Sequence, residues 1–370
     1  MKRFLAILLT MLLVALGIPT LAEGNEWEFN EARCLLTAYR GAGGDVSVPE
    51  KIGAGTVKTL DTGALAQVSG MTSLTLPETV MHMKDNAASW NPDLVQVTLP
   101  QSLMILGSDC FNNCDSLESV TIPAGVRYIG NGVFSDSDIL KDITFEGVCP
   151  TFDGEAFAYI AEDAIAYVPD DQLEAYQAAF AAMDNEISVQ PSGKSAVIVN
   201  NDGFRAEDFD FDAATGTIVK YNGAAVYLCI PETIDGVQVQ AIGENAFQFN
   251  YDLAYIVLPE GLTSIESGAL SHCNTLLHVT FPTTLQTIAD DAFAGGSYKG
   301  YTLDLPSVQT IGARAFEHAR LRNVLTLPEG LTDIGEGAFT STSLYEVYLP
   351  ASLNSIGSMA FAQSWSLNYI

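Results

Sequence analysis

Three alternating aspartates, Asp208, Asp210 and Asp212, have the spacing best suited to chemistry in this chain. Carboxylates in this pattern open the calcium loop of an EF-hand, which also needs a glycine in its sixth place and a glutamate in its twelfth. Ala213 and Val219 occupy those places, so the loop is incomplete. A phenylalanine stands between each pair of aspartates. This alternation favours a strand whose acidic side faces water over a calcium site.

Cysteine and histidine, the other common metal ligands, are scattered. No two cysteines have the Cys-x-x-Cys spacing of a zinc site, and the six in 370 residues are too few for a disulfide scaffold. Cys114 and Cys273 fall at one position of the repeat described below, which predicts small buried core residues without a redox role. We expect the four histidines at the surface, since they fall in different repeats: His82, His272, His278 and His318. The sequence therefore predicts no metal ion and no cofactor.

Catalytic motifs are also missing from the sequence. It contains no Gly-x-Ser-x-Gly, no His-Glu-x-x-His and no Walker loop. The glycine-rich run at 41–44 corresponds to Gly223 and Ala224 in a later copy of the same segment, so we interpret it as a turn. No catalytic residue is predicted, and the chain is not expected to be an enzyme.

The first 22 residues have the pattern of a secretory signal peptide. Two basic residues precede an apolar run from Phe4 to Leu16, and Thr20-Leu21-Ala22 offers small residues to signal peptidase. Cleavage there makes Glu23 the first residue. The alternative is an uncleaved anchor, but the run is short for a membrane span. No later apolar run is long enough to cross a bilayer, so we expect an exported protein without a membrane span once the signal is removed.

The chain that remains after cleavage is strongly acidic. Without the two basic residues of the signal it has 14 Lys and Arg against 45 Asp and Glu, a net charge of −31. Such a surface repels phosphate backbones and anionic lipid head groups, so nucleic acid is not expected as a partner. Solubility of a large exposed surface explains the charge, and calcium binding is the alternative.

A repeat of about 23 residues governs the rest of the sequence. Prolines recur near this interval, and most follow a Leu-x-x-(Val/Ile)-x-(Leu/Ile/Phe) segment, as at 94–100 and 276–282. The alternation in Val97-Thr98-Leu99 predicts a short strand, and proline ends it because proline has no N–H for the next ladder bond. The prolines concerned are Pro77, Pro100, Pro123, Pro259, Pro282, Pro306, Pro328 and Pro350.

A second extended piece follows each proline and leads to Ile-Gly-x-x-Ala-Phe, as at 242–247 and 334–339. We expect the isoleucine to point inward, the glycine to turn the chain, and the phenylalanine to fill the wedge between coils from a tight helical turn. In this register Ile288 is buried and Thr280 is exposed. One repeat buries too little apolar surface to offset the entropy of ordering it, so the repeats must stack.

The whole array occurs twice, since Pro77 and Phe111 recur as Pro259 and Phe293. We predict a first module at 23–189, a linker at 190–195 and a second module at 196–370. Each half opens with a two-strand capping hairpin, at 209–221 in the second half. The first half closes with a strand and a short helix. That helix is expected to have Asp170 as its N-cap and an apolar face of Leu173, Tyr176 and Phe180.

The second half ends differently, because Leu367-x-x-Ile370 is the start of another repeat. An open coil exposes apolar edge. We therefore expect either that the sequence is a fragment or that a partner covers this end.

These motifs resemble the BspA-like leucine-rich repeat family of bacterial surface proteins. The resemblance covers most of the chain from Val46 to Ile370. It implies a right-handed, β-rich leucine-rich-repeat solenoid with short helical turns. It also implies a secreted or surface-attached protein that binds host, matrix or other bacterial proteins, with no active site shared by the family. Residues 71–90 depart from the pattern, because Met83 and Ala88 replace Ile and Phe, and we expect a looser coil there.

Two functions are consistent with this organisation: a binding or adhesion module, and the targeting arm of an exported enzyme whose catalytic domain lies beyond Ile370. We favour the first. The strands before the prolines should form one sheet whose outward side chains make an extended face. On the second module this face is rich in aromatics with a polar tip, which are enriched at interfaces, although tyrosine also simply suits strands. The predicted residues for an extracellular protein or matrix ligand are Tyr255, His278, Thr280, Tyr345, Glu346 and Tyr348.

Overall fold

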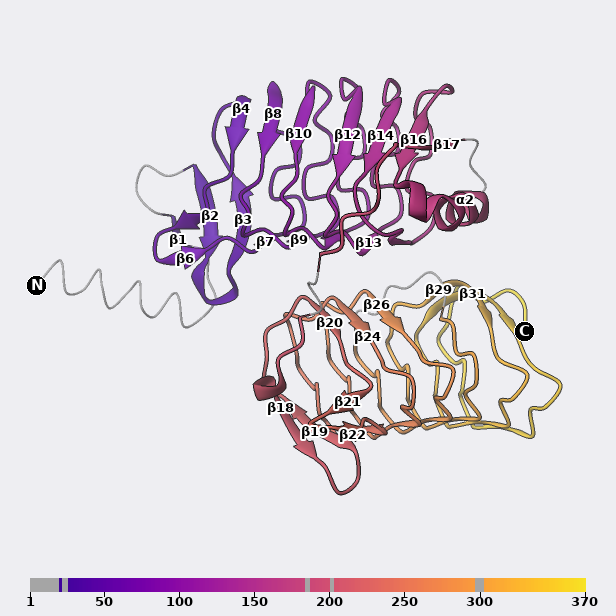
Figure 1. Ribbon diagram of the computed structural model, residues 1–370. Coiled ribbons are helices and arrows are strands. Elements are labelled where there is room, and N and C mark those ends of the chain that lie inside the picture. The colour runs from indigo at the N-terminus through magenta and orange to yellow at the C-terminus, as the bar shows by residue number, and fades with distance from the viewer. Residues whose placement is uncertain (1–19, 22–25, 184–186, 200–202, 297–302) are drawn as a thin grey trace, which may run out of the picture. The chain divides into compact units, whose positions relative to one another are not determined.

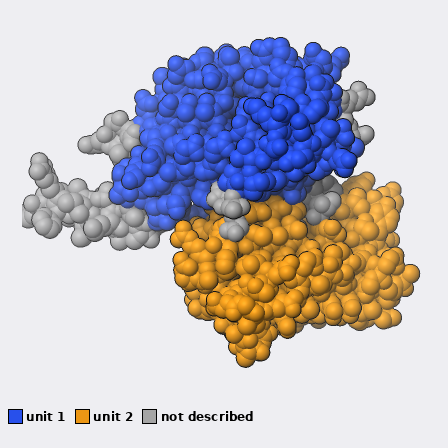
Figure 2. All heavy atoms as spheres, in the orientation of Figure 1, with its two compact units in different colours: residues 1–201 blue, residues 202–370 orange. Residues whose placement is uncertain are grey.

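The computed structural model describes residues 20–21, 26–183, 187–199, 203–296 and 303–370. The chain divides into two compact units, Met1–Asn201 and Asp202–Ile370, and each is a solenoid of stacked coils (Figure 1; Figure 2). The predicted signal peptide, residues 1–22, lies outside the described residues except for β1 (Thr20–Leu21), which pairs antiparallel with β2 (Trp27–Asn30).

Two parallel sheets run along the first unit, one for each extended segment of the repeat. We call the strands that precede the repeat prolines, with their continuation at the end of the unit, the proline sheet. It pairs in two groups: β4 (Gly44–Ser47), β8 (Met71–Thr75) and β10 (Gln96–Thr98), then β12 (Ser119–Ile122), β14 (Asp142–Phe145), β16 (Ile165–Val168) and β17 (Ser188–Pro191). The strands at the isoleucine position form the isoleucine sheet: β7 (Thr59–Leu60), β9 (His82–Met83), β11 (Ile105–Leu106), β13 (Tyr128–Ile129) and β15 (Thr151–Phe152).

The second unit repeats this arrangement. Its proline sheet pairs as β20 (Tyr227–Cys229), β24 (Tyr255–Val257) and β26 (His278–Thr280), and as β29 (Arg322–Thr326) with β31 (Ser343–Tyr348). Its isoleucine sheet contains β23 (Ala241–Ile242), β25 (Ser264–Ile265), β27 (Thr287–Ile288), β28 (Thr310–Ile311), β30 (Asp333–Ile334) and β32 (Ser355–Ile356). Both sheets are parallel because the chain advances by one coil between neighbouring strands.

The predicted capping hairpins are present. In the second unit β18 (Phe209–Asp212) pairs antiparallel with β19 (Thr217–Tyr221), and β19 continues into the isoleucine sheet. In the first unit β2 pairs with β3 (Leu35–Tyr39) in the same way. The remaining short elements are η1 (Glu31–Arg33), η3 (Ala206–Asp208), and the two-residue hairpins β5 (Lys51–Ile52) with β6 (Gly55–Thr56) and β21 (Thr233–Ile234) with β22 (Val237–Gln238).

The third side of each coil is a run of tight turns around the Ala-Phe pair. Coils of the second unit place two residues here at φ near +60°, for example Asp291 at 58° and Gly295 at 67°. Their N–H groups point along the stack and donate to the next coil, from Asp291 to Ala313 O at 2.9 Å and from Gly295 to Glu317 O at 2.8 Å. Gly, Asn and Asp adopt this left-handed conformation most readily, but larger residues such as Phe249 and Arg314 also adopt it in this unit.

Phenylalanine ladders fill the core of each unit. In the second unit Phe293, Phe316, Phe339 and Phe361 stack with ring centroids 5.1, 5.3 and 5.3 Å apart. The first unit has the same ladder, from Phe111 through Phe134 to Phe157. Each ring contacts its equivalents above and below, so a coil at the end of a stack has one uncovered ring face.

A helix covers the last ring of the first unit. The helix α2 (Leu173–Ala182) follows η2 (Asp170–Gln172), and its Phe180 stacks on Phe157 at 5.7 Å. Tyr176 and Phe180 are buried, as predicted. The N-cap prediction is wrong, because Asp170 lies within η2 and its carboxylate accepts the Gly193 N–H at 2.8 Å. The intervening 3-10 turn moves Asp170 away from the start of the helix.

The segment predicted as a linker, residues 190–195, packs against the first unit. Gln190 and Pro191 lie in β17, which pairs with β16. Gly193 is bound to Asp170, and Asp170 N–H donates to Lys194 O at 2.8 Å. The boundary between the two compact units lies further along the chain, at Asn201/Asp202.

The coil at 71–90 is as well packed as its neighbours, although a looser coil was expected. Met83 and Ala88 are fully buried. The buried amide of Asn91, in the place that Cys114 takes one coil later, donates to Leu65 O at 3.0 Å and to Ala88 O at 2.7 Å. The first bond ties the coil to the preceding one, and the second closes the turn that carries Ala88.

The register can be tested with a pair of substitutions to aspartate. Ile288 is fully buried and Thr280 is exposed. Ile288→Asp would bury an unpaired carboxylate and should lower the free energy of unfolding by several kcal/mol, on the order of 3–5. Thr280→Asp should change it by less than about 1 kcal/mol. The measurement is the urea midpoint followed by circular dichroism, and equal losses would contradict this register.

Candidate functional site

Three of the predicted site residues, Tyr255, His278 and Thr280, lie together on the proline sheet of the second unit. Strand pairing places Tyr227, Tyr255 and His278 in one row on β20, β24 and β26. Their rings form a ladder, with centroids 5.1 Å apart for Tyr227 and Tyr255 and 4.7 Å for Tyr255 and His278. The Tyr255 hydroxyl lies 3.1 Å from Thr280 Oγ1. The row is therefore held by stacking and a hydrogen bond.

Tyr255 is not exposed, contrary to the expectation for an outward position on this sheet. Only 4% of its surface is accessible, and its ring lies between the rings of Tyr227 and His278. Alternation along the strand gives the direction of a side chain but not how much its neighbours cover it. Tyr255 is therefore packed between its neighbours on this face, while Thr280 is exposed on the face and accessible to a ligand.

The other three predicted residues lie on β31, at the far end of the unit. Tyr345 and Tyr348 are 49% and 53% exposed, and the Tyr348 hydroxyl donates to Glu346 Oε1 at 2.9 Å. A bulge in the pairing with β29 leaves Tyr345 without a register partner. The strand of this group, β31, pairs with β29, whereas Tyr255, His278 and Thr280 lie on the separately paired strands β24 and β26. The six predicted residues therefore form two groups.

The first unit contains a cleft that the sequence did not indicate. It lies at the carboxyl ends of β14 and β16, where a returning segment, residues 192–199, crosses the outward face of the proline sheet. We call this segment the strap. The cleft has a volume of about 500 Å³, and its lining includes Thr144, Glu146, Tyr167, Lys194, Ser195 and Val197. The strap follows β17 in sequence, so its return over earlier coils has no repeat signature.

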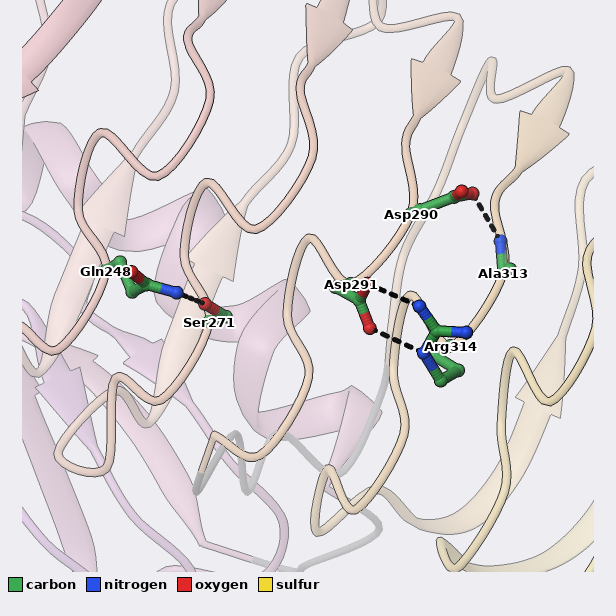
Figure 3. A network of polar contacts seen from close by, with 6 residues as sticks. All are labelled: Gln248, Ser271, Asp290, Asp291, Ala313 and Arg314. Carbon is green, nitrogen blue, oxygen red and sulfur yellow. Dashed lines mark hydrogen bonds and ion pairs between the residues drawn. The ribbon is translucent and has the colours of Figure 1, made fainter.

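Many polar side chains on the turns of the second unit are used in contacts between coils. Figure 3 shows Arg314 bound to both carboxylate oxygens of Asp291, at 2.9 and 2.8 Å. Asp290 accepts the Ala313 N–H at 2.7 Å, and Gln248 donates to Ser271 at 2.9 Å. Each of these pairs joins residues 23 positions apart. This network stabilises the stack, and its carboxylates are already occupied.

The cysteines behave as core residues. Cys114 and Cys273 are buried, as predicted, and burial raises the pKa of each thiol to about 12. Burial also raises the pKa of Cys110 and that of Cys149. Cys110, Cys114, Cys149 and Cys273 are free thiols. The nucleophilic thiolate is therefore strongly disfavoured at these four positions.

The prediction of surface exposure holds for the alternating aspartates but only for some of the histidines. His272 and His318 are exposed, as predicted, but His278 is half-buried and His82 is only 3% exposed. The prediction is wrong for His82, since β9 packs between β7 and β11 and carries it inside the sheet. Asp210 and Asp212 are exposed on β18, as expected for the wet side of a strand.

Within the described ranges, no group of three or more His, Cys, Asp or Glu side chains is placed to hold a metal ion. In the same part of the chain, no helix has the length and apolar character needed to cross a membrane.

Stacked coils with a leucine-rich consensus, two parallel sheets and a phenylalanine ladder define a leucine-rich-repeat solenoid. The sequence matches the BspA type leucine-rich repeat region over residues 49–162 and 238–369, with six copies. The chain belongs to this family. Among curated proteins none matches it.

Solved leucine-rich-repeat structures show local similarity to this chain. The T. pallidum protein TpLRR is 18% identical, with a TM-score of 0.32, over 71% of this chain and 83% of that one. A leucine-rich cell surface protein from Faecalibacterium prausnitzii is 19% identical, with a TM-score of 0.33, over 95% and 94%. The pneumococcal vaccine antigen PcpA is 17% identical, with a TM-score of 0.32, over 92% and 88%.

The half-buried histidine of the aromatic ladder predicts a pH dependence. Burial lowers the pKa of His278 to about 4, so the unfolded chain binds this proton more readily than the folded unit. The stabilisation is fully present above about pH 6.5 and is lost as the pH falls toward 4, by up to about 3 kcal/mol. The protection factors of amides in β24 and β26, which are corrected for the intrinsic exchange rate at each pH, should therefore fall on acidification.

The matched control is His278→Phe, which keeps a stacking ring and removes the titrating group. It should lose this part of the acid sensitivity, while the part that comes from carboxylates remains. If the parent protein and His278→Phe lose the same protection in β24 and β26 on acidification, His278 is charged in the folded unit and the prediction is wrong.

Proposed function

We propose that this protein is an exported, non-catalytic binding or adhesion protein, and that the outward proline-sheet face of its second unit contacts an extracellular protein or matrix ligand. The observation that carries the proposal is the exposure of Tyr345 and Tyr348, at 49% and 53%, on a rigid strand. Tyrosines bury a large area while ordering few torsions, and they are enriched among interface residues that dominate affinity.

The polar groups beside these tyrosines support the same role. Glu346 accepts the Tyr348 hydroxyl, which orients that ring on the surface. Thr280 is exposed on the same sheet face, on β26, over the stacked rings of Tyr255 and His278. A stiff backbone with oriented side chains loses little entropy on binding, so such a surface needs no rearrangement to receive a partner.

The chemistry of the described residues is consistent with binding without catalysis. Burial raises the pKa of four thiols, which disfavours cysteine nucleophiles. Acidic side chains on the turns are engaged between coils, as for Asp290 and Asp291. Family membership supports a repeat-based binding role in the same way.

The binding face can be tested with a double substitution, Tyr345→Ala with Tyr348→Ala. Loss of both rings should weaken attachment of the protein to its ligand by at least about tenfold, which corresponds to one to two interface anchors. Binding to a panel of immobilised matrix proteins, measured by surface plasmon resonance, provides the readout. The control is Thr326→Ala, at the position paired with Tyr348 on β29 and also exposed. Equal binding of parent, double variant and control would remove this face from the proposal.

Export is tested separately by N-terminal sequencing of the protein after expression in a host with a secretory pathway. The mature chain should begin at Glu23, because cleavage follows Thr20-Leu21-Ala22. An intact Met1 on protein that stays in the cytosol would contradict export and, with it, an extracellular ligand.

A further inference from the structure

Hydrogen bonds fix the strap of the first unit along its length. Asp170 N–H donates to Lys194 O at 2.8 Å, and Ala196 N–H donates to Asp171 Oδ1 at 2.8 Å. Further on, Val197 N–H donates to Glu146 O at 2.8 Å, and Arg127 donates to Val199 O at 2.7 Å. The strap thus follows the loops after β16, β14 and β12 in turn. The strap therefore forms a fixed wall of the cleft.

The floor of the cleft consists of side chains on interior strands. Thr144 and Tyr167 are register partners on β14 and β16 and point to the outward face. β14 pairs with β12 and β16, and β16 pairs with β14 and β17. No free strand edge of these two strands is open to an incoming peptide backbone, so a ligand must be recognised through side chains.

The side chains around the cleft are rich in hydroxyl groups and contain one group of each charge. Thr144, Ser195 and Tyr167 offer hydroxyls that both donate and accept, Glu146 accepts, and Lys194 donates. Gln101 donates to Glu146 Oε2 at 2.7 Å, which orients the carboxylate and leaves its second oxygen available to a ligand. Glu146 and Lys194 contribute opposite charges, so the lining has no excess of either sign.

This chemistry selects a neutral ligand that carries many hydroxyl groups and an apolar face. A fully apolar ligand would leave the polar lining unpaired, and an anion would be repelled by a chain of net charge −29. A sugar ring presents hydroxyls at its edge and C–H groups on its face, and the latter pack on an aromatic ring such as that of Tyr167. A volume of about 500 Å³ is within the range of small-molecule sites.

We propose that the cleft between the strap and the ends of β14 and β16 binds a short neutral oligosaccharide. Tyr167 supplies the stacking surface, Glu146 accepts two sugar hydroxyls through its free oxygen, and Lys194 and Ser195 donate from the strap. This site lies within the first unit alone. It is separate from the tyrosine face of the second unit, and neither site depends on the other.

The test uses the full mature chain and three soluble probes: maltotriose, cellotriose and triacetylchitotriose. Saturation-transfer NMR should detect at least one of them, and titration should give a dissociation constant on the order of 1 mM. Tyr167→Ala should weaken that binding by about tenfold through loss of the stacking surface. Ser195→Trp should abolish it, because a large side chain on the exposed strap would fill the cleft.

Two controls keep the result interpretable. Thr75→Ala changes an exposed threonine of the same sheet outside the cleft and should bind like the parent. The pair Tyr345→Ala with Tyr348→Ala should also retain sugar binding, which separates this site from the proposed protein-binding face. Circular dichroism should show that all variants fold.

The proposal is overturned if none of the three probes binds, or if Tyr167→Ala and Ser195→Trp bind the sugars as the parent does. A Ser-Gly-Ser-Gly peptide serves as a further probe. If its saturation-transfer signal is stronger than that of any sugar, and if Ser195→Trp abolishes that signal, the cleft is a peptide site and the proposal is overturned.

Discussion

Hydrogen bonding between backbones of successive coils is the constraint on which the rest of the structure depends. Successive coils are hydrogen-bonded on all three sides: Thr287 N–H donates to Thr263 O of the preceding coil at 3.1 Å, while Leu258 N–H and Phe293 N–H donate to Thr280 O and Ala315 O of the following coil at 3.0 and 2.7 Å. The spacing of strands is about 4.8 Å, so a residue lies directly above the one 23 positions earlier. Every side chain must therefore be compatible with its equivalent in the neighbouring coil.

This constraint explains both the core and the surface. Phenylalanines align face to face inside, with Phe316 and Phe339 5.3 Å apart and only 3° from parallel. Outside, three ion pairs join opposite charges 23 positions apart, from Asp61 to Lys84, from Glu118 to Lys141 and from Asp291 to Arg314. A single coil could make none of these contacts, which is why the unit of folding is the stack.

Features that repeat in the sequence could be predicted, and features that depend on non-repeating contacts could not. The recurrence of Ile correctly predicted that Ile288 is inside, and the helical spacing of Tyr176 and Phe180 correctly predicted that both are buried. The burial of Tyr255 depends on its contacts with neighbouring coils. The cleft depends on a segment that returns across earlier coils after its own repeat pattern has ended.

The stacking of coils also determines how each unit responds to tension. Because coils contact mainly their immediate neighbours, a pulling force on the chain acts on the outermost coil first. Its release would free 23 residues, which extend to about 80 Å at roughly 3.5 Å per residue. The next coil then bears the load with an interface of the same kind. A protein tethered between two surfaces and built in this way would lengthen in steps, each of which dissipates work before the attachment itself is loaded.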